Sequence, residues 1–272
     1  MGAFLHHFSY DFKTGIRDRS RLLMFYLFPL VFFFLVGGLM GSLNPYFLPT
    51  MIPAMVLFAF MCAALLNLPN VFVTARESGV FRSYRINGVP AASILAIPVL
   101  GTLVHMAIVG IIVTVAGVRI YGGSAPAAVL GFVAGALLSY AAYAGIGALI
   151  GVAAGSGTAS ILIAQVLYIP SIILGGLMVP TSILPGALQR ISLLLPATHG
   201  MRVMASLGGI GTATGVPWAS IVVLAAGATL GFGLAAMLFR WDARASQPGG
   251  GRMALALLAA VPYAAAALIG MA

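Results

Sequence analysis

The chain has 272 residues, of which 62% are hydrophobic and only 6% are charged. Thirteen basic and four acidic side chains give a formal net charge of +9, and the mean hydropathy is +1.13. A soluble domain carries about a quarter charged residues, so this composition excludes an ordinary water-soluble fold. The apolar runs are continuous and do not alternate with polar residues, which favours transmembrane helices over barrel strands.

Residues 1–21 mix aromatic and large apolar side chains with basic ones. A merely solvated leader would leave these apolar groups in water. The mixture is typical of an amphipathic helix that lies in the membrane interface, with its rings toward the acyl chains and its cations outward. We therefore predict an interfacial helix over residues 1–21.

Six apolar runs are long enough to cross a bilayer as helices. They cover residues 22–43, 51–74, 93–117, 125–153, 158–180 and 216–239. The first run begins too late and is too long for a signal peptide. The sequence therefore predicts an all-α integral membrane domain over residues 22–239.

The basic side chains are unevenly divided between the two sides of the membrane. Ten fall on the side of the N-terminus and the 75–92 loop: Lys13, Arg17, Arg19, Arg21, Arg76, Arg82, Arg85, Arg240, Arg244 and Arg252. Only Arg119, Arg190 and Arg202 fall on the other. The positive-inside rule then predicts a multi-pass protein of the cell membrane with a cytoplasmic N-terminus. Topology and anionic lipid head groups explain the net charge without a nucleic-acid partner.

Several kinds of chemistry are missing from the chain. All four acids lie outside the predicted spans, which disfavours an ion-coupled carrier. His105 is the one titratable side chain well inside a span; it is either a proton relay or, as we favour, a packed histidine bonded to a neighbouring helix. A lone cysteine, Cys62, excludes an internal disulfide and a cysteine-ligated metal.

Enzymatic motifs are also missing. There is no His-Glu-x-x-His, and the sole lysine, Lys13, does not follow a glycine-rich phosphate loop. Gly155-Ser156-Gly157 is more typical of a turn than of a catalytic nucleophile. We therefore expect a chain that is not an enzyme and binds no metal or cofactor. If its transport is active, ATP is hydrolysed on another chain.

The loop over residues 75–92 has the features of a docking element. Arg82 and Arg85 are three residues apart and share one face of a short predicted helix, with Phe81 and Tyr84 on an adjoining face. Glu77 is expected at the helix N-terminus, where a carboxylate is favourable. The Gly-Val-Pro sequence at 88–90 ends the helix. The alternatives are a rigid knob for a soluble partner, which we favour, and a loop that only sets topology.

The segment between the last two spans, residues 181–215, is too apolar for an exposed loop. Leucine and isoleucine recur at helical spacing between Pro185 and Pro196. This pattern predicts a short helix that dips back into the outer leaflet.

Three stretches resemble the type-2 permeases of ATP-binding cassette exporters. Residues 75–82 (Ala-Arg-Glu-Ser-Gly-Val-Phe-Arg) and 87–90 (Asn-Gly-Val-Pro) resemble the signature of the family's cytoplasmic loop. Residues 174–180 (Leu-Gly-Gly-Leu-Met-Val-Pro) are similar to the end of its fifth span. Leu184-Pro185 and residues 195–199 (Leu-Pro-Ala-Thr-His) resemble its external re-entrant segment. Together they cover roughly 70–205 in the order that the family shows.

The resemblance implies a six-span permease that pairs with a second copy or a paralogue. It also implies a coupling helix that docks on a separate cytoplasmic ATPase, which binds ATP and magnesium. The implied coupling residues are Arg76, Glu77, Gly79, Arg82, Arg85, Gly88 and Pro90. The implied external gate residues are Gly175, Gly176, Pro180, Pro185, Pro196, Thr198 and His199.

A pathway poor in charge favours export of an amphipathic or hydrophobic substrate, such as a drug, an antibiotic or a lipid-like molecule. Multidrug efflux from the cell is the corresponding role, and a passive channel that needs no nucleotide is the alternative.

Two features leave the architecture open. Gly-x-x-x-Gly spacings occur at Gly37/Gly41, Gly131/Gly135, Gly147/Gly151 and Gly227/Gly231. They serve either a dimer interface or packing within the chain, and we expect the latter to explain most of them. Residues 240–272 add a basic linker and an apolar run, 253–271, which either spans the membrane or packs in the interface or against another subunit.

Overall fold

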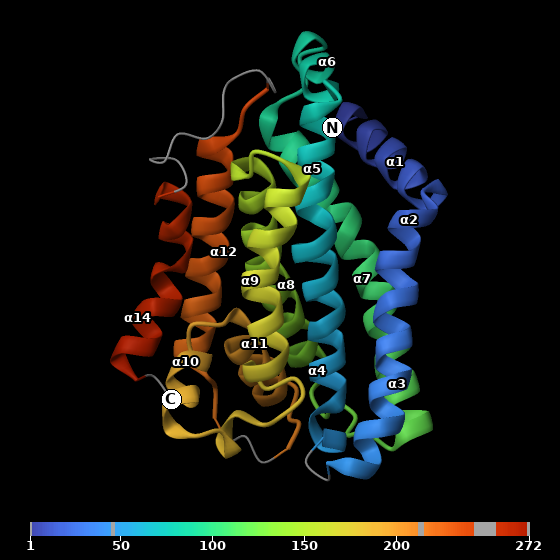
Figure 1. Ribbon diagram of the computed structural model, residues 1–272. Coiled ribbons are helices and arrows are strands. Elements are labelled where there is room, and N and C mark those ends of the chain that lie inside the picture. Colours follow the sequence, from blue (N-terminus) through green and yellow to red (C-terminus); the bar gives the residue numbers. More distant parts are fainter. Residues whose placement is uncertain (1, 45–46, 212–214, 242–253, 271–272) are drawn as a thin grey trace.

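The computed structural model describes residues 2–44, 47–211, 215–241 and 254–270, and these residues form helices and turns without a strand. Most of the helices run side by side along one axis (Figure 1). The predicted all-α membrane architecture is confirmed.

Six helical stretches are long and apolar enough to cross a membrane: Arg19–Gly41, Phe47–Glu77, Ala91–Tyr121, Val129–Ala153, Gly157–Leu174 and Trp218–Leu238. They correspond one to one with the six predicted spans. The largest difference is at the end of the fifth, which was predicted to reach residue 180. The helix ends at Leu174 because two glycines follow, and Gly176 has a φ of 88°, which a residue with a side chain rarely adopts.

The helices within and between these spans have the following bounds: α1 (Gly2–Arg17), α2 (Arg19–Leu22), η1 (Leu23–Leu27), α3 (Phe28–Leu43), α4 (Phe47–Met61), η2 (Cys62–Asn67), α5 (Leu68–Glu77), α6 (Val80–Ile86), α7 (Ala91–Tyr121), α8 (Val129–Ala153), α9 (Gly157–Leu174), η3 (Thr181–Ile183), α10 (Gly186–Ser192), α11 (Pro196–Leu207), α12 (Trp218–Leu238), η4 (Leu257–Ala260) and α14 (Val261–Ile269).

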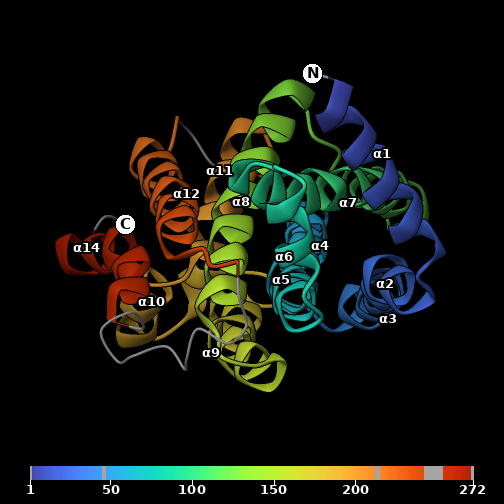
Figure 2. The same ribbon diagram turned by 90° about the horizontal axis from the view of Figure 1, so that it is seen from above.

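The second span, α4–η2–α5, lies at the centre of the bundle. Its most apolar stretch is 89% buried, whereas the other five spans are buried over 22–50% of theirs. Viewed along the bundle axis, α4 and α5 lie between α3 on one side and α12 with α14 on the other (Figure 2). The outer helices therefore turn much of their apolar surface outward, as expected where the solvent is lipid.

A single π-helical turn interrupts each of the first two spans. The turns η1 and η2 contact each other, and a proline follows each by two residues, Pro29 after η1 and Pro69 after η2. A proline has no N–H for the helical ladder, and its ring crowds the carbonyl four residues earlier, so the preceding turn widens.

Helix α8 contacts the centre of the bundle through glycines. A methyl group at Gly147 would lie 1.9 Å from the Ala64 carbonyl oxygen, and one at Gly151 would lie 2.9 Å from Pro69. On α8, Gly131 and Gly135 lie in the same way against Leu207 and Met204 of α11. Small residues let two backbones approach closely, which is how helices associate in lipid.

The remaining glycine pairs also pack within the chain. Gly231 of α12 lies against Gly145 of α8, Gly227 lies under the Tyr263 ring of α14, and Gly37 and Gly41 contact α4. The interpretation of these spacings as packing within the chain is confirmed for all four pairs.

The last apolar run forms a helix over Ala254–Ile269 that is shorter than the six spans. It packs along α12, and its C-terminal end lies near α10 (Figure 1). Most of the preceding linker, residues 242–253, lies outside the described residues.

The two ends of the bundle differ. One end, called the α6 end below, carries α1 and α6; the other, the α10 end, carries α10 and the turns beside it (Figure 1). The segment 181–215, predicted to hold one short re-entrant helix between Pro185 and Pro196, holds two α-helices in its described part. Helix α10 covers only part of the predicted helix and is largely exposed, whereas α11 is the helix that inserts between α8, α9 and α12. Pro196 ended the predicted helix, but a proline in the first turn is well suited to begin one.

The glycine contact between α8 and the central span predicts a large effect of one methyl group. Gly147→Ala is expected to destabilise the protein by about 2 kcal/mol or more, because its Cβ meets backbone that cannot move aside. Thermal unfolding in mild detergent measures the effect. Gly233→Ala is the matched control, because nothing lies within 4 Å of its Cβ position. An equal response of the two variants would contradict the packing argument.

Candidate functional site

The candidate coupling segment, residues 76–90, forms a rigid projection at the α6 end. Helix α5 ends at Glu77, and Gly79 turns the chain with a φ of 77° so that α6 can begin at Val80. Gly88, with a φ of 70°, ends α6, and Pro90 in extended conformation starts α7 at Ala91. The projection is therefore joined to the second and third spans with almost no intervening loop.

Two aromatic contacts fix α6 on the bundle. Phe81 is buried and its ring centroid lies 5.2 Å from that of Phe239 after α12, and the Tyr84 ring lies 4.8 Å from His7 of α1. The opposite face is exposed and carries Arg82, Arg85 and Ile86; the Ile86 side chain is 79% exposed. The predicted division into a basic face and an aromatic face is what the helix shows.

The structure corrects the position of Glu77. It was expected at the N-terminus of the loop helix, but α5 stays helical through Glu77, so the carboxylate lies at a helix C-terminus. There the helix dipole disfavours a negative charge. Glu77 is exposed beside Ser78 and Gly79. The helix dipole therefore does not explain why a carboxylate occupies this position.

Arg76 is turned away from the exposed face. Its guanidinium donates hydrogen bonds to the carbonyl oxygens of Gly151 at 3.3 Å, Val152 at 3.0 Å and Ala154 at 2.5 Å. These carbonyls end α8 and have no partner within that helix. Arg76 therefore joins α5 to the end of α8 and does not lie beside Arg82 and Arg85.

The candidate gate segment, residues 175–207, surrounds a cavity of about 340 Å³ at the α10 end. Four of the seven predicted gate residues line it: Gly175, Gly176, Pro180 and Thr198. Arg202 and Ser206 of α11 also line it, and neither was predicted from the sequence. Their spacing could have indicated this, because Arg202 lies about one helical turn and Ser206 about two turns after Thr198 on the same helix.

The other predicted gate residues lie behind this cavity. His199 is 1% exposed; its Nε2 donates to the Leu193 carbonyl at 2.9 Å, which leaves Nδ1 to accept from the Ser220 hydroxyl at 3.1 Å. Burial lowers the pKa of His199, which lies outside the six spans, so the neutral imidazole is favoured. Thr198 donates to Ser192 at 2.6 Å. These bonds fasten the start of α11 to α10 and α12, and Pro185 and Pro196 begin the two helices.

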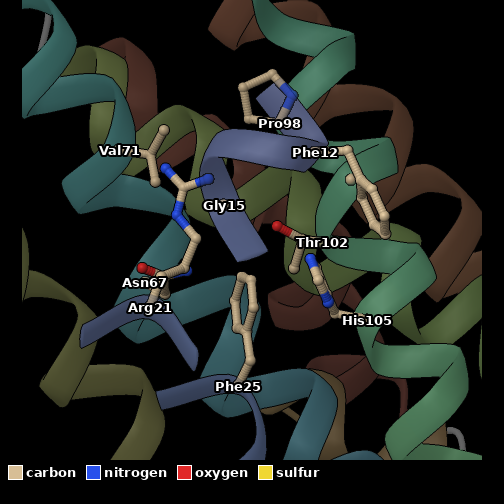
Figure 3. Close-up of a pocket in the computed structure, with 10 residues that line it drawn as sticks. Phe12, Gly15, Arg21, Phe25, Asn67, Val71, Pro98, Thr102 and His105 are labelled. Carbon is tan, nitrogen blue, oxygen red and sulfur yellow. The ribbon is translucent and has the colours of Figure 1, made fainter. Parts of the chain in front are cut away.

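A third site, near the α6 end, surrounds His105. The Nδ1 atom of this histidine lies 2.7 Å from the Tyr26 hydroxyl, and its ring stacks on Phe12 of α1 at 4.9 Å. This is the packed histidine, bonded to a neighbouring helix, that the sequence favours. Arg21 and Asn67 line the same small cavity from the other side (Figure 3). From the sequence, Arg21 was predicted only to set topology and Asn67 was not a candidate, although an amide inside an apolar run can indicate a polar site.

No group of three or more metal-ligating side chains occurs in the described parts of the chain. The arrangement offers an exposed basic helix face at the α6 end and a cavity at each end.

The Arg76 contacts predict a structural role that can be separated from docking. Arg76→Gln is expected to lower stability by about 1–2 kcal/mol, because three carbonyls lose a charged donor. Arg76→Lys should restore part of this, since it retains the charge but not the planar fork. Arg82→Gln, on the exposed face, is the control and should leave thermal unfolding unchanged. An unchanged unfolding temperature in Arg76→Gln would contradict the assignment.

A match to a known family agrees with this arrangement. No curated protein and no solved structure matches the chain. The family described as ABC-2 type transporter matches residues 3–207. That region contains five of the six spans, the candidate coupling segment and the candidate gate segment. The match covers well over half of the sequence, and the chain therefore belongs to the ABC-2 type transporter family as a membrane permease component.

Proposed function

We propose that this protein is the permease subunit of an ATP-driven exporter and that α6 docks on a separate ATPase, which binds ATP and magnesium. The observation that carries the proposal is the exposed, rigid α6 with its basic and apolar outer face. Arg82, Arg85 and Ile86 supply charge and apolar area, and Glu77 lies at the adjoining turn. Gly79, Gly88 and Pro90 supply the two tight turns.

The connections of α6 supply a route for movement. It is joined to α5 on one side and to α7 on the other by short turns. The Val89 N–H donates to the Tyr84 carbonyl at 3.0 Å, which stabilises the turn between α6 and α7. Arg76 joins α5 to α8. A displacement of α6 by the ATPase would therefore reach three spans together, as a two-state switch requires.

The distribution of charge along the chain supports the proposed orientation. The α6 end holds α1, α2 and α6 and the end of α12, whose basic residues are Lys13, Arg17, Arg19, Arg82, Arg85 and, just after α12, Arg240. Arg119, Arg190 and Arg202 belong to the end of α7, to α10 and to α11. The positive-inside rule supports a cytoplasmic α6 end and N-terminus in the cell membrane. The same orientation suits α1 as an interfacial helix and α6 as the contact with a soluble ATPase.

The proposed substrate is amphipathic or hydrophobic, and its path runs between two permease copies. The support is the low charge of the spans and the exposed apolar face of α9, where Leu162 and Val166 are 64% and 76% exposed. A second copy or a paralogue would cover this face and the similar outer face of α3.

The docking proposal predicts a selective loss of partner binding. Arg82→Glu and Glu77→Lys are expected to abolish co-purification of an ATPase subunit in mild detergent, because each reverses a charge on the docking surface. Mass spectrometry identifies the ATPase by its phosphate-binding loop, and quantitative blotting measures the permease itself. Arg17→Glu, an exposed reversal on α1 at the same end, is the control and should retain the partner.

Two results would count against the docking proposal. Retention of the ATPase by both α6 variants would place the contact elsewhere. The absence of any ATPase, even after cross-linking before solubilisation, would favour the passive channel and leave residues 75–92 as a topology signal.

The substrate proposal predicts ATP-dependent uptake of amphipathic probes into inverted vesicles. Fluorescent hydrophobic cations, lipid-like antibiotics and labelled glycans are compared in vesicles that contain the permease with its ATPase. The Glu77→Lys vesicles are the control and should show no ATP-dependent uptake of any probe. Uptake confined to hydrophilic glycans would overturn the substrate class.

A further inference from the structure

A second polar cavity lies at the α6 end, between the start of the first span, α5 and the start of α9. Its volume is about 550 Å³. The residues that line it include hydroxyl and amide side chains on the side of the α6 end and Met24, Leu66 and Ile161 on the side of the spans. The small cavity beside His105 shares Arg21, Asn67 and Val71 with it, so the two spaces meet at these residues.

Arg21 brings a positive charge to this junction. Its guanidinium reaches under α1, where Nη1 lies 2.9 Å from the position that a Cβ on Gly15 would occupy. In Figure 3 the guanidinium extends into the cavity toward Val71 and Gly15. Asp18 lines the same cavity, but its side chain accepts the backbone N–H of Arg21 at 3.2 Å. Among the described residues, no ion pair joins the guanidinium to a carboxylate.

Asn67 brings an unsatisfied donor to the same place. Its Nδ2 is buried and has no hydrogen-bond partner among the described residues. Buried amides are nearly always paired, so an unpaired one beside a cavity indicates a missing acceptor. Asn67 is the last residue of the π-helical turn η2, which sets its direction relative to the regular helix.

The cavity at the α10 end has the same chemistry. Arg202 lines it together with the hydroxyls of Thr198 and Ser206. It lies at the opposite ends of the same two spans, where α4 contributes Thr50 and the end of α9 contributes Gly175. Each of the two cavities is therefore lined by one arginine and several hydroxyl or amide groups, and the spans between them are apolar.

We propose that the cavity of about 550 Å³ at the α6 end binds the anionic phosphate group of an amphiphile, with Arg21 and Asn67 as the binding residues. The proposal rests on the function proposed above and names the substrate class more closely. A phosphate offers several acceptor oxygens, which match the five guanidinium donors and the unpaired amide. The apolar part of the amphiphile lies against Met24, Leu66 and Ile161. A free phosphate has the same chemistry without a tail.

Lipid cross-linking tests the site without the ATPase. The purified chain is placed in nanodiscs of neutral phosphatidylcholine that contain a photoactivatable phosphatidic acid, and labelled peptides are identified by mass spectrometry. We expect saturable labelling of the peptides that contain Met24, Leu66 and Ile161, which face the tail. A phosphatidylcholine analogue with the same photoactivatable tail should label them far less, because choline covers its phosphate.

Three variants assign the binding to Arg21 and Asn67. Arg21→Gln is expected to raise the half-saturating lipid fraction by about tenfold or more, as loss of a charged hydrogen bond does. Gly15→Ala keeps every charge but displaces the guanidinium, and should weaken binding in the same direction. Asn67→Ala removes a donor that has no partner, so folding should persist while binding weakens. Arg19→Gln is the matched control, because Arg19 is exposed and does not line the cavity.

The competition arm separates the two sources of phosphate. Loss of labelling when millimolar inorganic phosphate is present before irradiation would show that the phosphate group alone is recognised. Loss of labelling only with unlabelled phosphatidic acid would show that the tail contributes. Equal labelling by the two lipid analogues, or equal binding by the Arg21→Gln and Arg19→Gln proteins, would overturn the proposal. Such a result with ATPase co-purification intact would leave the proposed exporter function standing.

Discussion

The close approach of α8 to the central span is the constraint on which the rest of the structure depends. In lipid, apolar side chains gain no hydrophobic free energy by packing against one another, because the lipid tails are equally apolar. Helices therefore associate through tight packing and hydrogen bonds. Gly147 and Gly151 provide that packing against η2 and α5, where a methyl group would already meet backbone atoms. The same helix offers Gly131 and Gly135 to α11 and Gly145 to α12. One glycine-rich helix thus sets the positions of three others.

This packing also determines where polar chemistry can occur. The interior of the bundle is apolar, and the arginines with a defined contact or cavity lie near its two ends. Arg76 donates to the carbonyls at the end of α8, Arg21 lies under α1, and Arg202 lines the cavity of the candidate gate segment. A charge costs least where the helix ends and the membrane surface can serve it. Under the proposed function, a permease built this way would bind a polar group at each end and offer an apolar path between them.

The candidate coupling and gate segments differ in how much of each could be predicted from the sequence. In α6, the three-residue spacing of Arg82 and Arg85 and the Gly-Val-Pro stop are local signals, and the helix appears where they predict it. Glu77 was misplaced because nothing local shows that α5 continues past the membrane run. In the gate segment, proline was read as the end of a helix, although Pro196 begins α11. The choice between the two depends on what the following residues pack against.

The sequence by itself determined the class of the protein, the number and position of its six spans, and the family. Hydropathy and short motifs are properties of consecutive residues, so they need no knowledge of the fold. The tertiary structure alone decided that Arg76 caps α8, that His105 packs between Tyr26 and Phe12, and that Arg21 and Asn67 share a cavity. These facts join residues dozens of positions apart, and only the packing of one helix on another brings them together.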